Sequence, residues 1–262
     1  MTADEIKYHA KGLNFVEEGK ILLYKYIDFE GGLSLIKNQT FKFAKTESFN
    51  DPFDLYEELI DFSIQDKELN NSNISRTERR IIKNIPLKKK IVSTKKLWNE
   101  QRNNFGISCF SKIYDNILMW SHYAEKHRGI CIGFLVDIAK LININISTYS
   151  VEYKTKFSPL PFYDKDIDKR LKTLVQYLTV KAEFWSYEDE IRLIDFGYFL
   201  KYTNEFFNFS NYAEIKEIYF GLKVPGSNKK IINNLFLESK PKPLFYNLSR
   251  KKTTFKIKRE IA

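Results

Sequence analysis

Polar and aromatic side chains gather in FGISCFSKIYDNILMWSHYAEKHRGICIGF, residues 105–134, between two apolar runs typical of strands. On a helix that begins after an Asp115 N-cap, Trp120, Tyr123 and His127 would share one face. Such a face could line a pocket, its aromatic rings stacking on a planar ligand and its imidazole contacting a phosphate or ribose. The alternative is a core stripe in which His127 complements the helix dipole. The candidate side chains in this stretch are Ser108, Ser111, Trp120, His122, Tyr123 and His127.

A second group of ionisable residues lies in EFWSYEDEIRLID, residues 183–195. If this segment is a strand, Glu188, Glu190 and Arg192 point to one face. One glutamate could then orient a ribose hydroxyl or stabilise an oxocarbenium ion, while the second positions a nucleophile. The alternative is a solvent-facing Glu–Arg pair that contributes little to stability.

The segment FNDPFD, residues 49–54, is rich in turn-forming residues, with Asn50 and Asp51 before Pro52. A structural turn is the default interpretation, and Asp51 and Asp54 could also clamp a loop or coordinate a cation. No metal is expected, because no helical His-x-x-x-His or Cys-x-x-Cys pair accompanies these carboxylates. The sequence also lacks a Gly-x-Ser-x-Gly motif, so it gives no indication of a hydrolase triad.

The segments that must position these residues alternate between strand and helix patterns without a regular β–α–β rhythm. This predicts an α+β fold, with a mixed, mainly antiparallel sheet as its core and flanking helices. Residues 1–262 are expected to form a single domain, in which residues 65–102 are a basic helical insertion or small lobe. Strands are expected at ILLYKYID, FGISCF, GICIGF, EDEIRLIDF and EIKEIYFGL, a helix capped by Ser227 at SNKKIINNLFLES, and a hairpin at the C-terminus.

The charge of the chain favours an anionic partner. Its formal net charge is +10, and the excess is concentrated in residues 76–102 and 249–260. Such blocks are typical of nucleic-acid-binding surfaces, although an ordinary solvated surface would have the same composition.

The remaining composition indicates a cytoplasmic protein without a membrane partner. Cys109 and Cys131 lie in apolar runs, which favours reduced core thiols over a disulfide. No apolar run reaches the roughly 20 residues of a membrane span, and the first residues do not resemble a signal peptide.

Several motifs together resemble a bacterial family known chiefly as a domain of unknown function. They are LYKY, FNDPFD, ISCFS, MWSHYAEKHRGICIGF and WSYEDEIR, the last of which begins with Trp185. The resemblance runs from about residue 22 to residue 222. It places Asn50, Asp51, Asp54 and Trp185 among the candidate pocket or loop residues.

The order of elements also resembles, more distantly, that of the ADP-ribosyltransferases, above all the DNA-targeting toxin branch. In this comparison LLYKY supplies Tyr24 and Lys25, ISCFS supplies Ser108 and Ser111, and YEDEIR supplies Glu190. Glu188 completes a Glu-x-Glu form. The chain departs from the pattern by having lysine where histidine or arginine is expected, and by lacking the fuller Ser-Thr-Ser motif.

The resemblance implies NAD as a substrate. Ser108 would grip the nicotinamide ribose side, Glu190 would bind the ribose 2′-hydroxyl, and Lys25 would meet a phosphate. Trp120, His122, Tyr123 and His127 would line the pocket. A toxin or defence effector of this kind would modify nucleic acid or protein and would need a neutralising or regulatory partner.

Two other functional classes remain open. One is a nucleic-acid-binding protein that uses residues 76–102, with or without metal-dependent nuclease activity at Asp51, Asp54, Glu188 and Glu190. The other is a non-catalytic interaction domain. The transferase hypothesis requires Tyr24, Ser108 and Glu190 to converge.

Overall fold

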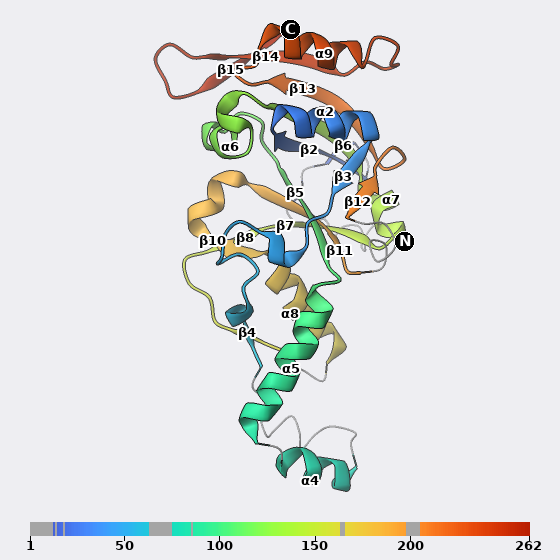
Figure 1. The fold of residues 1–262 in the computed structure, drawn as a ribbon, viewed down its shortest axis with the longest axis vertical. Coiled ribbons are helices and arrows are strands. Elements are labelled where there is room, and N and C mark those ends of the chain that lie inside the picture. The colour runs from blue at the N-terminus through green and yellow to red at the C-terminus, as the bar shows by residue number, and fades with distance from the viewer. Residues whose placement is uncertain are drawn as a thin grey trace. The chain divides into compact units, whose positions relative to one another are not determined.

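The computed structural model describes residues 13, 15–17, 19–62, 75–84, 86–162, 166–197 and 205–262. It divides into two compact units, each built from segments that are distant in sequence (Figure 1). Unit 1 comprises Met1–Ala44, Gly106–Val151 and Phe184–Ala262, and unit 2 comprises Lys45–Phe105 and Glu152–Glu183. The expectation of a single domain stays a prediction. Residues 65–74 of the expected insertion lie outside the described residues.

Unit 1 is built on a nine-stranded sheet in the order β15-β14-β13-β6-β2-β5-β11-β7, with β1 paired to β2. All neighbouring strands are antiparallel except β13 and β14, which confirms the predicted α+β fold with a mainly antiparallel sheet. The strands are β1 (Phe15–Glu17), β2 (Lys20–Ile27), β5 (Gly106–Ser111), β6 (Ile130–Asp137), β7 (Ile146–Ser150), β11 (Glu190–Asp195), β13 (Ala213–Phe220), β14 (Leu244–Arg250) and β15 (Ile257–Ile261).

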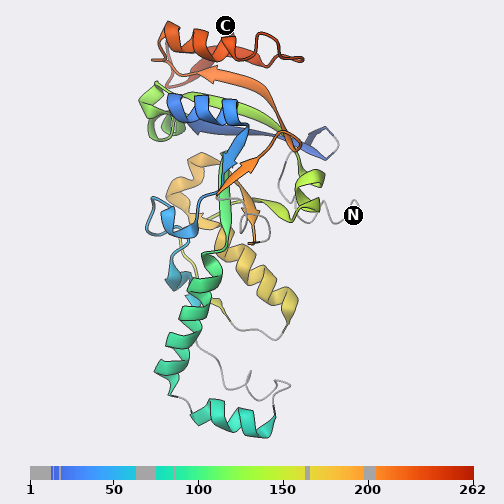
Figure 2. The same ribbon diagram turned by 45° about the vertical axis from the view of Figure 1, so that its right-hand side comes forward.

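Helix α2 (Phe29–Asn38) begins at the Asp28 N-cap and packs its apolar stripe against the sheet (Figure 2). The core there is aromatic, because Phe41 contacts the rings of Phe110 and Phe134. The other elements of unit 1 are α6 (Ile117–His122), α7 (Ile138–Asn143), α9 (Gly226–Asn234), the short helix η3 (Glu125–His127) and the strand pair β3 (Thr40–Lys42) and β12 (Phe206–Asn208).

Two helix caps differ from the expectation. The side chain of Asn116, not Asp115, accepts the backbone N–H groups of Leu118 and Met119 at the start of α6. Helix α9 follows Pro225, so Ser227 lies inside the helix rather than at its N-cap. Proline is well suited to a helix start because its φ angle is already near the helical value.

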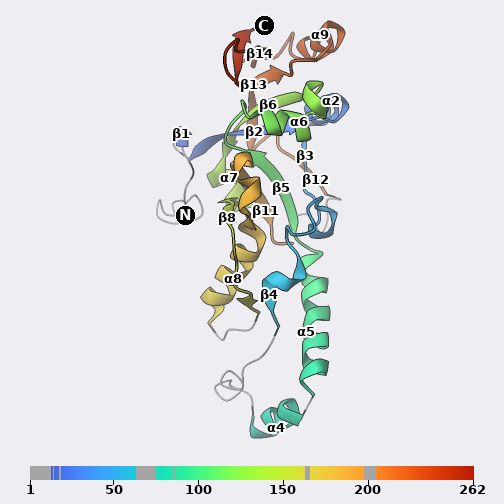
Figure 3. The same ribbon diagram turned by 90° about the vertical axis from the view of Figure 1, so that its left-hand side faces the viewer.

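The α-helices of unit 2 among its described residues are α4 (Arg76–Asn84), α5 (Leu87–Arg102) and α8 (Ile167–Thr179) (Figure 3). Helix α5 begins after Pro86. Trp98 of α5 packs edge-to-face on Tyr177 of α8, and it also contacts Phe62 and Phe162. This aromatic cluster joins the two segments of the unit. Its elements are η1 (Thr46–Ser48), η2 (Glu57–Leu59), β4 (Ile60–Asp61), α4 (Arg76–Asn84), α5 (Leu87–Arg102), β8 (Glu152–Lys154), β9 (Leu160–Pro161), α8 (Ile167–Thr179) and β10 (Val180–Ala182). The short helix η4 (Glu183–Glu188) begins at the last residue of unit 2.

Gly129 lies where the loop after η3 passes over the end of β2. A Cβ atom at this position would lie 2.2 Å from the backbone carbonyl oxygen of Ile27. We expect Gly129→Ala to lower the free energy of unfolding by about 1–3 kcal/mol, since backbone must move to admit the methyl group. Gly226→Ala is the matched control, because its Cβ would meet nothing within 4 Å. Equal urea midpoints for the two variants would contradict the close packing at Gly129.

Candidate functional site

A cross-strand row on one face of the unit 1 sheet forms the candidate site. Tyr24 of β2 pairs with Ser111 of β5, and Ser111 pairs with Glu190 of β11. Residues paired across strands point to the same face, so these three side chains share it. On the other side of Tyr24 the row continues through Gly133 of β6 to Glu217 of β13. Five neighbouring strands therefore contribute to one row with a carboxylate at each end.

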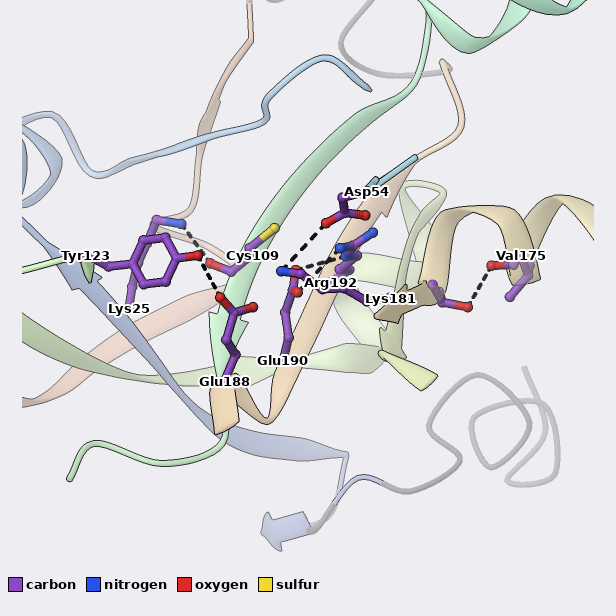
Figure 4. A network of polar contacts seen from close by, with 10 residues as sticks. Lys25, Asp54, Cys109, Tyr123, Val175, Lys181, Glu188, Glu190 and Arg192 are labelled. Atoms are coloured by element: carbon purple, nitrogen blue, oxygen red, sulfur yellow. Dashed lines mark hydrogen bonds and ion pairs between the residues drawn. The ribbon is translucent and has the colours of Figure 1, made fainter. Parts of the chain in front are cut away.

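Glu190 and Arg192 form a buried ion pair next to this row (Figure 4). Arg192 Nε donates to Glu190 Oε1 at 2.8 Å, and its Nη2 lies 3.3 Å from Oε2. The side chains are 4% and 0% exposed for Glu190 and Arg192 respectively. At this burial a carboxylate depends on its partner, so the guanidinium holds Glu190 in place and compensates its charge.

Glu188 does not continue the strand, as the alternating pattern predicted. It ends the short helix η4, and Asp189 then takes a φ of 42° before β11 begins. Its carboxylate nevertheless lies buried, where Tyr123 of the loop after α6 donates to Oε1 at 2.6 Å (Figure 4). The Ser111 hydroxyl donates to the backbone carbonyl of Glu188 at 2.6 Å. Tyr123 and Ser111 thus fix the carboxylate-bearing turn to the sheet.

The variant Tyr123→Phe measures how much the hydrogen bond between Tyr123 and Glu188 contributes to stability. Loss of a hydrogen bond to a charged group is expected to lower the free energy of unfolding by about 1.5–3 kcal/mol. Tyr212→Phe serves as the control, because the Tyr212 hydroxyl makes no hydrogen bond within the described part of unit 1. Chemical denaturation of the two variants gives the comparison, and equal stability would show that the Tyr123–Glu188 contact contributes nothing.

Lys25 and Ser108 lie on the opposite face from Glu190. Ser108 pairs with Leu193, and the alternation along β5 turns it away from Ser111. Lys25 Nζ donates to the Cys109 carbonyl at 2.8 Å and lies 4.7 Å from the centre of the Phe110 ring. Burial lowers the pKa of Lys25, because desolvation disfavours the ammonium. Its side chain bridges β2 and β5, whose ladder consists only of the Tyr24–Ser111 pair among the described residues.

The Tyr24 hydroxyl points along the row towards Glu217, to which it donates at 3.1 Å. Tyr219 donates to the same carboxylate oxygen at 2.8 Å, and Arg259 donates to the Tyr219 hydroxyl at 2.7 Å. Burial and the neighbouring Glu217 charge raise the pKa of Tyr24, so it remains a phenol at neutral pH. Gly133 makes room for the ring, since a Cβ there would lie 3.1 Å from Tyr24 Cε1.

The expected helix after residue 115 is shorter than the sequence pattern predicted, because α6 ends at His122. Trp120 is a core residue: it is fully buried and donates from Nε1 to the Tyr114 carbonyl at 2.7 Å. His122 is exposed and lies 2.9 Å from the Tyr187 hydroxyl through Nδ1. Trp185 contacts Tyr187 with ring centres 6.0 Å apart. The side chains predicted to line one pocket are therefore separated: Trp120 lies in the core, Tyr123 contacts Glu188, and His122 is at the surface.

The FNDPFD segment forms a tight turn in unit 2. Asp51 Oδ1 accepts the backbone N–H of Phe53 at 2.9 Å, as an Asx turn does, and Asn50 is exposed. Asp54 is buried and forms an ion pair with Lys181 at 3.6 Å (Figure 4). These carboxylates and the two glutamates of the proposed nuclease site belong to different units. No group of three or more His, Cys, Asp or Glu side chains in the described ranges could hold a metal ion.

A shallow pocket of about 190 Å³ opens beside Tyr24, lined by β1, β2 and Lys112. Lys112 also forms an ion pair with Asp189 at 2.9 Å, which ties this pocket to the turn between Glu188 and Glu190. Sites for drug-sized ligands usually measure about 300–1,000 Å³. The pocket has room for part of a dinucleotide rather than the whole.

Comparison with known proteins gives one match. Residues 119–193 match a family model described as protein of unknown function (DUF2971). The DUF2971 match covers less than a third of the chain and extends from α6 into β11, so it contains Glu188, Glu190 and Arg192. No curated protein and no solved structure matches the chain. The wider family resemblance and the likeness to ADP-ribosyltransferases stay predictions, as do the cytoplasmic location and the partners.

No helix within the described ranges is long and apolar enough to cross a membrane.

Sequence reasoning did not identify the other half of the row, Gly133 and Glu217, or the Tyr219 and Arg259 side chains that contact it. The segment EIYF offered a signal, because a glutamate two residues before a tyrosine points to the same face of a strand. Arg259 could not be assigned, since its contacts depend on how the C-terminal hairpin pairs with β13 through β14.

Proposed function

We propose that unit 1 is an NAD-consuming enzyme of the ADP-ribosyltransferase type, a transferase or a glycohydrolase, with Glu190 as its catalytic carboxylate. The observation that supports this most is the row of Tyr24, Ser111 and Glu190 on three neighbouring strands. An aromatic residue, a serine and a glutamate in that order match the resemblance found in the sequence. The required convergence of Ser108 with Tyr24 and Glu190 is not found, because Ser108 lies on the opposite face, and Ser111 takes its place in the proposal.

The reaction would break the bond between C1′ of the nicotinamide ribose and the pyridinium nitrogen. Nicotinamide leaves as a neutral molecule with the bonding electron pair, and positive charge develops on the ribose. The Glu190 carboxylate would accept the 2′-hydroxyl hydrogen bond and stabilise this oxocarbenium-like transition state. Water or an acceptor nucleophile then forms the new bond to C1′ and loses a proton. Glu188, held by Tyr123, would receive that proton or orient the nucleophile.

Arg192 has a positioning role in this proposal. It binds Glu190 through Nε and Nη2, which holds the carboxylate in a fixed orientation. The excess positive charge of the chain would attract NAD and an anionic acceptor. In a toxin or defence effector, a neutralising partner would cover this site.

A second candidate function is nucleic-acid binding by unit 2. It is favoured by the basic side chains that α4 and α5 expose to solvent, where a phosphate backbone could contact them. The exposed ones are Arg76, Arg80, Lys83, Lys89 and Lys96. A nucleic acid bound by unit 2 could be the acceptor for the transferase reaction of unit 1. Alternatively, the protein binds nucleic acid and catalyses no reaction.

The proposal is tested by incubating the purified chain with NAD labelled in the adenine ring, alone and with DNA, RNA or a protein extract. Free ADP-ribose alone would indicate a glycohydrolase, and label on one added polymer would identify the acceptor class. If NAD remains intact in every mixture and does not raise the melting temperature, the proposal is wrong. A gel-shift assay on the same polymers would then test nucleic-acid binding by itself.

A further inference from the structure

His127 lies at the end of the unit 1 sheet where β13 and β14 terminate, an end that is called the cationic edge below. Its backbone carbonyl accepts the N–H of Lys223, just beyond the end of β13, at 2.9 Å. β14 runs parallel to β13 and continues past it in the same register, which brings Arg250 to this edge as well. His127 of η3, Lys223 after β13 and Arg250 at the end of β14 therefore lie at the same end of the sheet, well apart in sequence from the Glu190 segment.

The charges at this edge are all of one sign except for Glu125. Lys126 and Arg128 flank His127 in sequence, and both are exposed, as are Lys223 and Arg250. None of these four cations forms an ion pair or a side-chain hydrogen bond with any residue that the structure describes. Many other surface lysines of unit 1 do have such a partner: Lys216 binds Glu214 at 2.9 Å. Four cations beside a single carboxylate, that of Glu125, leave an excess of positive charge that attracts an anion.

The imidazole itself has an unused polar atom. Its Nδ1 is buried and has no hydrogen-bond partner in the described part of the chain. The ring lies nearly parallel to that of the buried Trp120, with 9° between the planes and 6.0 Å between the ring centres. Burial and the charges of Lys223 and Arg250 lower the pKa of His127, so these cations act directly on the ring. Buried polar atoms normally have a partner, so no hydrogen bond within the described residues holds this imidazole, and it can bind a ligand through its accessible side.

The backbone holds this imidazole rigidly in an unusual conformation. Glu125, Lys126 and His127 have φ angles of 47°, 54° and 71°, a run of left-handed residues without glycine. Such conformations cost of order 1–3 kcal/mol each and persist where the surrounding structure enforces them, often at binding sites. Gly221 permits the close packing, since a Cβ there would lie 2.4 Å from the His127 carbonyl oxygen.

We propose that this edge is a phosphate-binding site, formed by His127 with Lys126, Arg128, Lys223 and Arg250. The N–H of His127 on the accessible side of the ring donates to a phosphate oxygen, and the four cations compensate its charge. The phosphate belongs either to a free nucleotide or to a nucleic-acid backbone, since both present the same group. This site is independent of the chemistry proposed for Glu190.

The test is a titration of the whole chain, followed by the imidazole NMR signals of His127, which are assigned with His127→Gln. Inorganic phosphate, ADP and a short oligonucleotide are added separately at constant ionic strength, with chloride as the reference anion. Saturable shifts of His127 signals and a rise in its pKa are expected, because a bound anion stabilises the imidazolium. Saturation with ADP alone would identify a nucleotide ligand, and tighter binding of the oligonucleotide would identify the nucleic-acid backbone.

Two substitutions make the titration specific. Lys223→Gln and Arg250→Gln are expected to weaken binding roughly 10- to 100-fold each, the value of one charge-assisted hydrogen bond. Lys216→Gln, whose native partner is Glu214, should leave it unchanged. Shifts that do not saturate with any of the three phosphates, or that chloride reproduces, would overturn the proposal. This result leaves the NAD reaction untouched, so the two proposals fail separately.

Discussion

Replacing Arg192 by methionine is expected to lower the free energy of unfolding by about 3–5 kcal/mol. The substitution leaves the Glu190 carboxylate buried without the guanidinium that binds it at 2.8 Å. Methionine fills a similar volume, so the loss reflects the missing guanidinium charge more than a cavity. Urea unfolding of unit 1, followed by the fluorescence of its buried Trp120, measures the effect.

The controls separate burial from charge. The double variant Glu190→Gln with Arg192→Met removes both charges and should recover most of the lost stability, as replacement of a whole buried pair often does. Lys216→Met breaks an exposed pair with Glu214 and should cost about 1 kcal/mol or less. If Arg192→Met behaves like Lys216→Met, the pair is not buried as described.

The sheet was largely predictable from the sequence, because its strands are short apolar runs in which the side chains alternate between the two faces. ILLYKYID, FGISCF and GICIGF became β2, β5 and β6, and the C-terminal hairpin formed as expected. The division into two units was not predictable. It depends on contacts such as that between Phe62 and Phe162, which are 100 residues apart and make an aromatic pair only after folding.

The candidate site was only partly predictable for similar reasons. Alternation correctly placed Glu190 and Arg192 on one face, but it failed at Glu188, because no residue pattern reveals the positive φ of Asp189. Ser111 and not Ser108 shares a face with Glu190 because of the register between β5 and β11. The sequence of one strand does not specify this register. The helix does not continue to His127, because Glu125, Lys126 and His127 have positive φ angles that helix propensity does not anticipate.

Removing the Glu190 carboxylate should have the largest effect on catalysis. Glu190→Gln keeps the shape of the side chain but removes the negative charge that would stabilise the ribose cation, so NAD cleavage should fall by on the order of 10²- to 10³-fold. The single variant leaves Arg192 buried with a neutral partner and risks misfolding. The double variant Glu190→Gln with Arg192→Met is therefore more informative, because it removes the Glu190 charge and is expected to recover most of the stability that a single substitution loses. Glu188→Gln should reduce the rate less if it only orients the nucleophile.

The most direct test measures nicotinamide released from NAD by the wild type and by this double variant, at matched folded fractions and with the acceptor that gives the most turnover. The proposed function predicts release by the wild type and a loss of at least about 10²-fold in the double variant. Equal rates in the two proteins, or no release by the wild type with any acceptor, would contradict a catalytic role for Glu190.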